Sequence, residues 1–156
     1  MASITGLSFN FQNFTWIFFV FGFLMMLITL PVVTYRYMKY PVAFEYNKPL
    51  ICIYAALINI LIVGYVNSFS DVNMYFLFSL YLMASIFYIF SLYKLIGYLK
   101  MPFYPSYSAF TFPFVISAIA STKLLSITNY NQAVSFIVLF EIVIATVMVA
   151  YVLAKF

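Results

Sequence analysis

Long apolar stretches separated by short polar breaks dominate the pattern of this chain. Five stretches are long enough to cross a bilayer, because a membrane-spanning helix needs about 20 mostly apolar residues at a rise of about 1.5 Å each. They cover residues 14–33, 49–66, 74–98, 108–127 and 132–154. The breaks contain residues that interrupt helices, among them Tyr40-Pro41, Met101-Pro102 and Asn129-Tyr130-Asn131. The pattern predicts an all-α integral membrane protein that forms one transmembrane domain of five helices.

Composition supports this class and excludes two others. Hydrophobic residues make up 67% of the chain and charged residues 6%, whereas a globular protein carries roughly 25% charged residues. So few charges cannot cover the surface of a water-soluble fold. A disordered chain would need low hydrophobicity and high charge. We therefore expect a multi-pass protein of the cell membrane, with the lipid bilayer as its surroundings.

The basic residues predict the orientation, because Lys and Arg gather in cytoplasmic loops. The breaks after the first and third stretches and the C-terminal end hold Arg36, Lys39, Lys48, Lys94, Lys100 and Lys155. The opposite side holds Lys123, next to Asp71. This bias predicts an N-terminus outside and a cytoplasmic C-terminus. Residues 1–13 carry no charge, so no signal peptide is predicted, and an outside N-terminus of this kind suggests that something precedes it.

The residue types leave little room for catalytic chemistry. The chain has no His and the single Cys52, so we expect no metal site and no cofactor. Its acids, Glu45, Asp71 and Glu141, are scattered, which argues against an enzyme. The basic residues stand singly at the ends of apolar runs rather than in a patch, so no nucleic-acid partner is expected. Cys52 is expected to be an inert buried thiol.

The most specific motif is YPSYSAFTFP at residues 104–113, followed by FVISAIA. It resembles the ninth transmembrane helix of the tellurite-resistance/dicarboxylate transporter family, which includes TehA-like proteins, fungal malate and sulfite exporters and the plant slow anion channels. The segment KPLICIYAA at residues 48–56 is similar to the start of that family's seventh helix, although Leu57 stands where members often have proline. Along the chain, spans and loop charges agree with helices six to ten.

The resemblance implies an architecture of ten helices in five hairpins, with the odd-numbered helices around a pore. The stretches 49–66 and 108–127 would then line the pore and the other three would be peripheral. It also implies that a phenylalanine of the ninth helix plugs the pore, and the motif places this gate at Phe112, with Phe110 as the alternative. Family members are often trimeric, so a homo-oligomer is a further implication.

Helical geometry adds details to the proposed pore wall. At about 100° per residue, Ser108, Phe112, Ile116, Ile119 and Lys123 share one face, so we expect an apolar pore wall with a cation at its outer mouth. Pro113 is expected to kink the helix.

Two further polar residues lie within the spans. Asn59 is a further pore-lining candidate, with packing as its equal alternative. Glu141, the one acid deep within a span, is expected to make a structural hydrogen bond, with a functional role as its alternative. Lys123 has snorkelling at the interface as its alternative role.

Five helices are half of the implied ten. We therefore expect these residues to be the C-terminal half of a longer protein, or a subunit completed by a separate N-terminal half, or a chain that self-assembles. The function expected is membrane transport of small anions of the tellurite, sulfite or C4-dicarboxylate class. The alternative is a truncated or accessory membrane subunit without transport activity of its own. The sequence does not choose the anion, and leaves open whether a channel or a proton-coupled carrier is involved.

Overall fold

The computed structural model describes the backbone at residues 12–40, 45–69, 71–99 and 104–155. The regular elements in these ranges are helical, and five of them are long and apolar enough to span a membrane. The elements are α2 (Gln12–Lys39), η2 (Glu45–Ile53), α3 (Tyr54–Ser68), α4 (Met74–Tyr98), η3 (Pro105–Phe110), α5 (Thr111–Ile127) and α6 (Gln132–Lys155). The predicted all-α membrane architecture is confirmed.

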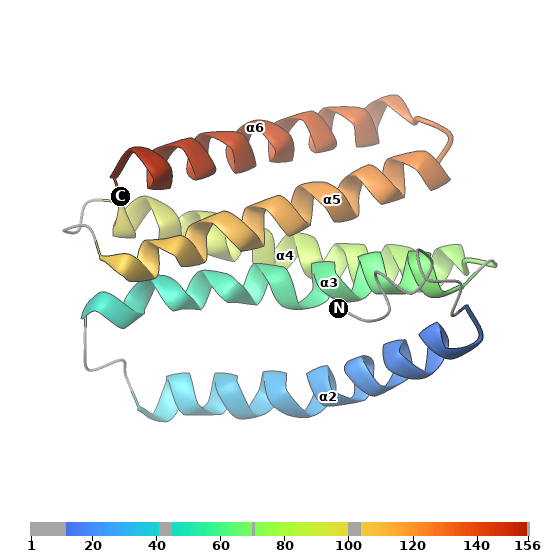
Figure 1. Ribbon diagram of the computed structural model, residues 1–156, viewed down its shortest axis with the longest axis horizontal. Helices are drawn as coiled ribbons and strands as arrows, with labels where there is room; N and C mark the ends of the chain where they lie inside the picture. Colours follow the sequence, from blue (N-terminus) through green and yellow to red (C-terminus); the bar gives the residue numbers. More distant parts are fainter. Residues whose placement is uncertain (1–11, 41–44, 70, 100–103, 156) are drawn as a thin grey trace.

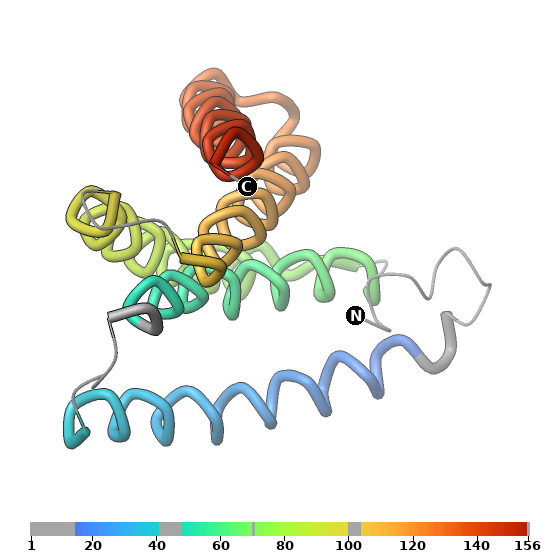
Figure 2. Tube along the Cα trace, turned by 60° about the vertical axis from the view of Figure 1, so that its left-hand side comes forward, coloured from blue at the N-terminus to red at the C-terminus, as the bar shows by residue number. Residues whose placement is uncertain are grey.

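Consecutive long helices run antiparallel, as Figure 1 shows. α3 and α5 pack against each other in the middle of the molecule; α2 and α4 pack on α3, and α6 packs on α5. Figure 2 shows α2 and α6 at opposite edges of this arrangement. The two stretches that the sequence predicts to line a pore are therefore the two central helices.

The two central helices begin differently from the prediction, because each is preceded by a 3₁₀ segment that contains a proline. Pro49 lies inside η2 and Pro105 begins η3, and the two 3₁₀ segments pack against each other. Proline has no N–H to donate into an α-helix, and 3₁₀ turns are common at α-helix ends. The spans keep their predicted length, but their first turns are more tightly wound.

Asparagines define the turns at the opposite end of the molecule. The Asn73 side chain accepts hydrogen bonds from the backbone N–H groups of Tyr75 and Phe76, at 3.0 and 3.3 Å, and so caps α4. Asn129 and Tyr130 have φ of 51° and 57°, and Asn131 Oδ1 accepts from the N–H of Ala133 at 2.9 Å. The predicted Asn-Tyr-Asn break therefore reverses the chain between α5 and α6. The predicted breaks at Pro41 and at Met101-Pro102 lie outside the described residues.

Two apolar clusters form the interior. One contains Ile58, Ile62, Leu77 and Leu124, near the end of the molecule that carries Asp71. The other contains Cys52, Tyr107, Phe110 and Phe114, near the end where α5 begins and α6 ends. The fold is held by two cores, one toward each membrane surface.

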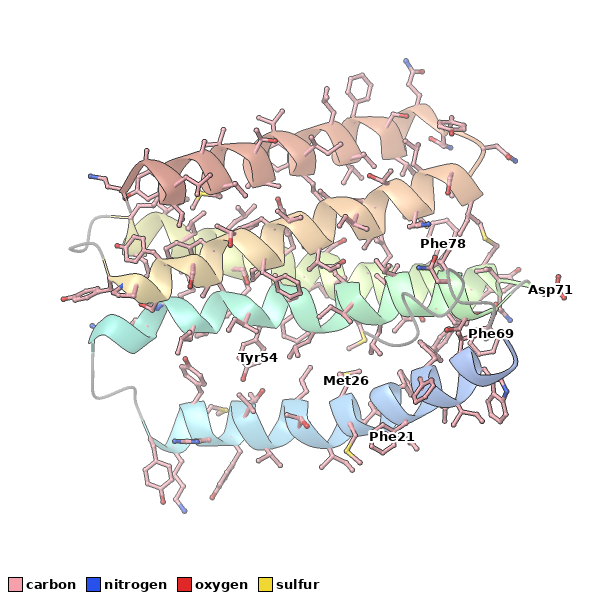
Figure 3. All side chains as sticks on the ribbon, viewed as in Figure 1. Phe21, Met26, Tyr54, Phe69, Asp71 and Phe78 are labelled. Carbon is pink, nitrogen blue, oxygen red and sulfur yellow. The ribbon has the colours of Figure 1, made fainter. Side chains whose placement is uncertain are left out.

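The outer faces of the peripheral helices are apolar and exposed, as a surface against lipid tails should be. These exposed side chains include Trp16, Phe21 and Ile28 on α2, Leu82 and Ile89 on α4, and Phe136, Leu139 and Leu153 on α6. Polar contacts join α2 to α3: Thr34 Oγ1 lies 3.2 Å from the Tyr54 hydroxyl, and Ser68 Oγ donates to the Thr15 carbonyl at 3.4 Å. Figure 3 shows Tyr54 directed toward α2.

Five of the basic residues lie at one end of the helices. Arg36, Lys39, Lys48, Lys94 and Lys155 lie at the end where α6 finishes, whereas Asp71 lies at the other end. Lys100 lies outside the described residues. This separation supports, as a prediction, an outside N-terminus and a cytoplasmic C-terminus.

Candidate functional site

The 3₁₀ segment η3 holds the start of the YPSYSAFTFP motif in place. The Tyr107 hydroxyl donates a hydrogen bond of 2.5 Å to the Tyr98 carbonyl at the end of α4. The Tyr107 ring packs edge-on against Phe110, with centroids 4.9 Å apart. Both side chains are fully buried. This anchor fixes the direction in which the following residues of α5 point.

The two phenylalanines of the motif, Phe110 and Phe112, and Phe114 directly after it lie in different environments. Phe110 and Phe114 are 0% exposed, and Phe114 packs edge-on against Tyr88 at 5.5 Å. Phe112 is 42% exposed. Phe112 is thus the motif phenylalanine that lies on an open face of α5, whereas Phe110, the alternative gate, is part of the core.

Two other predicted pore-lining residues, Ser108 and Ile119, share this open face with Phe112. We call these three residues the Phe112 face. Ser108 and Ile119 are both exposed, and Ser108 also accepts a hydrogen bond from Thr111 Oγ1 through its carbonyl, at 2.8 Å. Ile116 is 7% exposed and belongs to the cluster that joins α3 to α5. The helix is rotated so that Ile116 lies against α3, which gives it a packing position.

Pro113 is buried in the first turn of α5. The first four N–H groups of a helix have no partner within it, so the missing N–H of Pro113 leaves no bond unmade. Its own carbonyl accepts a hydrogen bond of 2.8 Å from Ser117 Oγ. The 3₁₀ winding of η3 changes to α-helix just before the proline, and the kink at Pro113 stays a prediction.

Asn59 does not lie on an open surface. It is 3% exposed, and its side-chain amide donates to the Ala55 carbonyl at 2.6 Å and to Ser117 Oγ at 2.8 Å. The second bond crosses from α3 to α5. In this position Asn59 connects the two central helices, which is the packing alternative considered for it.

Lys123 lies at the far end of the Phe112 face and is partly buried. With Val115, Ile119 and Thr122 it lines a groove of about 580 Å³ between α5 and α6, closed on the other side by Ile142, Thr146 and Leu153 among others. The groove is apolar apart from the Lys123 amine and the hydroxyls of Thr122 and Thr146. The Thr hydroxyls donate to carbonyls of their own helices, which leaves the Lys123 amine as the charged group of the groove.

Glu141 on α6 is 5% exposed and accepts a hydrogen bond from Ser121 Oγ on α5. The bond ties the two helices together at mid-membrane, and no basic side chain pairs with this carboxyl in the described ranges. Sequence reasoning missed the two tyrosines near it, Tyr81 and Tyr88 of α4. Their spacing of seven residues on one helix face was a signal that could have paired them.

Metal ligation is not supported by the described part of the chain, where no three His, Cys, Asp or Glu side chains come together. Cys52 is fully buried, and its Sγ lies 3.7 Å from the Ser91 carbonyl.

The fold and these residues define a multi-span helical membrane protein with an apolar face on a central helix. A family model described as voltage-dependent anion channel (SLAC1) matches residues 2–156. The chain belongs to this voltage-dependent anion channel family, which confirms the resemblance drawn from the motif. No curated protein and no solved structure gives a significant match.

Proposed function

We propose that this chain supplies the Phe112 face to a membrane pore through which small anions pass, and that the Phe112 ring obstructs that pore. The observation that carries the proposal is the contrast among the phenylalanines at residues 110, 112 and 114. Phe110 and Phe114 are fully buried in the core, whereas Phe112, between them, is directed out of it. A large ring held on an open face of a central helix, beside the smaller side chains of Ser108 and Ile119, is suited to blocking a passage.

The charges near this face favour anions over cations. α5 carries no acidic residue, and its one charged side chain is Lys123. The nearest acid along the neighbouring helix, Glu141, is buried and bonded to Ser121. A narrow apolar passage with a cation near one mouth and no competing carboxylate attracts anions by its local potential.

The Phe112 face is open among the described residues, so a closed pore needs further helices. These come from elsewhere in a longer chain or from another copy. The exposed face equally supports the second candidate, an accessory membrane subunit that conducts nothing alone. As substrates we propose small inorganic oxyanions such as tellurite and sulfite, together with C4-dicarboxylates, carried passively and without a cofactor.

The test is the reversal potential of currents through planar bilayers that contain the purified chain. Under a salt gradient, an anion pore gives a reversal potential close to the equilibrium potential of the anion. Replacing chloride with sulfite or malate should move it according to the relative permeability of each anion. A reversal potential that follows the cation gradient contradicts the proposal, and bilayers that stay silent at all protein densities support the accessory-subunit candidate.

A further inference from the structure

The centre of the membrane domain holds a carboxyl group surrounded by hydroxyl groups. Glu141 and Ser121 are 5% and 0% exposed, and Tyr88 is equally enclosed. Tyr81 lies seven residues before Tyr88, on the same face of α4. Both tyrosines lie within electrostatic range of the Glu141 carboxyl. Three helices therefore contribute to this cluster, which we call the Glu141 cluster: Glu141 from α6, Ser121 from α5, and Tyr81 and Tyr88 from α4.

The Ser121 hydroxyl has more acceptors around it than it has protons. Its Oγ lies 2.8 Å from the Ser117 carbonyl, 3.4 Å from the Ala118 carbonyl, and within hydrogen-bonding distance of Glu141 Oε2. A hydroxyl donates one proton, and a carbonyl donates none. If Ser121 donates to its own helix, its contact with Glu141 is a hydrogen bond only when the carboxyl brings a proton of its own.

Two buried hydroxyls of the Glu141 cluster have no hydrogen-bond partner among the residues that the structure describes. The Tyr81 and Tyr88 oxygens are both enclosed and neither makes a hydrogen bond of normal geometry, although Tyr81 lies beside Ser121. A buried hydroxyl without a partner loses its bonds to water and receives nothing in exchange. Each such group in a native structure needs an explanation, and a hydroxyl donor within electrostatic range of a carboxyl is available to a carboxylate.

We propose that the Glu141 cluster is a proton-binding site inside the membrane. It has one arrangement of hydrogen bonds for the protonated carboxyl and another for the carboxylate. In the protonated state the carboxylic acid donates to Ser121 Oγ, and Ser121 donates to the Ser117 carbonyl. When the proton passes to water, the Ser121 hydroxyl turns to the carboxylate, and the Tyr81 and Tyr88 hydroxyls become its further donors. The ligand is a single proton, and proton uptake reverses the same steps.

The groups that face Glu141 are consistent with a neutral acid as the resting form. α4 contributes the two tyrosines and α5 contributes Ser121. The single basic residue of α5, Lys123, lies in the groove between α5 and α6 and makes no ion pair with Glu141 in the described residues. Tyr107 of η3, which also packs against α6, donates to the Tyr98 carbonyl instead. The carboxylate would therefore be stabilised by hydroxyl donors alone.

The direct test is infrared difference spectroscopy of the full chain in lipid as the pH is raised. A protonated carboxylic acid has a C=O absorption that disappears on ionisation. We expect such a band in the wild type, its loss in E141Q, and its retention in D71N, the control for an exposed acid. The Gln amide can donate to Ser121 as the acid does, so E141Q is expected to fold. If it does not, isotope-labelled glutamate in an E45Q background, where Glu141 is the one remaining glutamate, assigns the band by shifting it.

The tyrosines are tested by the double variant Y81F/Y88F. Removing both donors destabilises the carboxylate, so the C=O band of the protonated acid should persist to higher pH than in the wild type. The control S79A removes an exposed hydroxyl of the same helix and should leave the titration unchanged. The absence of any band that depends on Glu141 overturns the proton site. An identical titration in Y81F/Y88F overturns the part of the tyrosines. Neither readout requires anion conduction, so the inference stands or falls separately from the proposed function.

Discussion

Asn59 on α3 and Ser117 on α5 are joined by a side-chain hydrogen bond of 2.8 Å, and this bond connects the two helices that the family resemblance places at the pore. Both residues are buried. Ser117 Oγ in turn donates to the Pro113 carbonyl at 2.8 Å. The position of the first turn of α5, and with it that of Phe112, is therefore linked to α3 through two polar contacts.

A double-mutant cycle of Asn59→Ala and Ser117→Ala should reveal this link as a coupling energy. Interhelical hydrogen bonds in membranes contribute about 0.6 kcal/mol on average and up to about 1.7 kcal/mol, and we expect a value in that range. The measurement is the free energy of unfolding in detergent micelles for the four proteins of the cycle. Pairing Asn59→Ala with Ser85→Ala on α4 provides a cycle that should show no coupling.

Phe110→Ala should destabilise the fold strongly, whereas Phe112→Ala should not. Emptying a fully buried phenylalanine position costs about 3–5 kcal/mol, and Phe110 also loses its ring contact with Tyr107. Phe112 has a large part of its surface already exposed and leaves no closed cavity. Thermal unfolding of the two variants checks this, and equal losses of stability would contradict the different environments assigned to the two rings.

The membrane orientation is testable because the chain has a single cysteine. Cys52 is fully buried, so a membrane-impermeant maleimide should not label the folded wild type from either side. On a Cys52→Ser background, Lys155→Cys should be labelled only from the cytoplasmic side and Asp71→Cys only from outside. The opposite pattern would contradict the predicted orientation.

Lys123→Gln should lower anion conductance by a few-fold. One charge near a water-filled mouth interacts with a passing anion by about 1 kcal/mol at 4 Å, and salt screens the effect. The loss should therefore shrink when the salt concentration is raised. Lys94→Gln, at the opposite end of the molecule, is the matched control, and an effect of Lys123→Gln that does not depend on salt would argue for packing instead of charge.

The sequence predicted the long helices well because the membrane imposes a length and a polarity that are visible in one dimension. α4 and α6 begin at the predicted residues 74 and 132. α2 continues past the predicted end at Val33 to Lys39, because Thr34, Tyr35 and their neighbours extend the helix into the interface region. The 3₁₀ starts of the two central spans were not predicted, since a proline signals only that an ordinary helix is interrupted.

The candidate site was predictable in part. The motif predicted Phe112 as the gate; the structure places its ring on an open face of α5, and the gating itself stays a prediction. Helical periodicity placed Ile116 on the same face as Phe112. Periodicity alone does not show whether a residue at the edge of such a face packs against the neighbouring helix α3, as Ile116 does, or is exposed. Tyr81 and Tyr88 were missed because tyrosine is frequent in this chain, with 15 copies, so their seven-residue spacing alone did not distinguish them from the others.

The central claim is that the Phe112 ring obstructs an anion pathway, and the conductance of Phe112→Ala tests it most directly. The variant and the wild type are reconstituted in planar bilayers beside Phe78→Ala, whose ring has a similar exposure of 46% on the peripheral helix α4. We predict that Phe112→Ala raises the anion current at least several-fold, while Phe78→Ala behaves as the wild type. Currents of Phe112→Ala that equal those of the wild type and of Phe78→Ala would contradict the account.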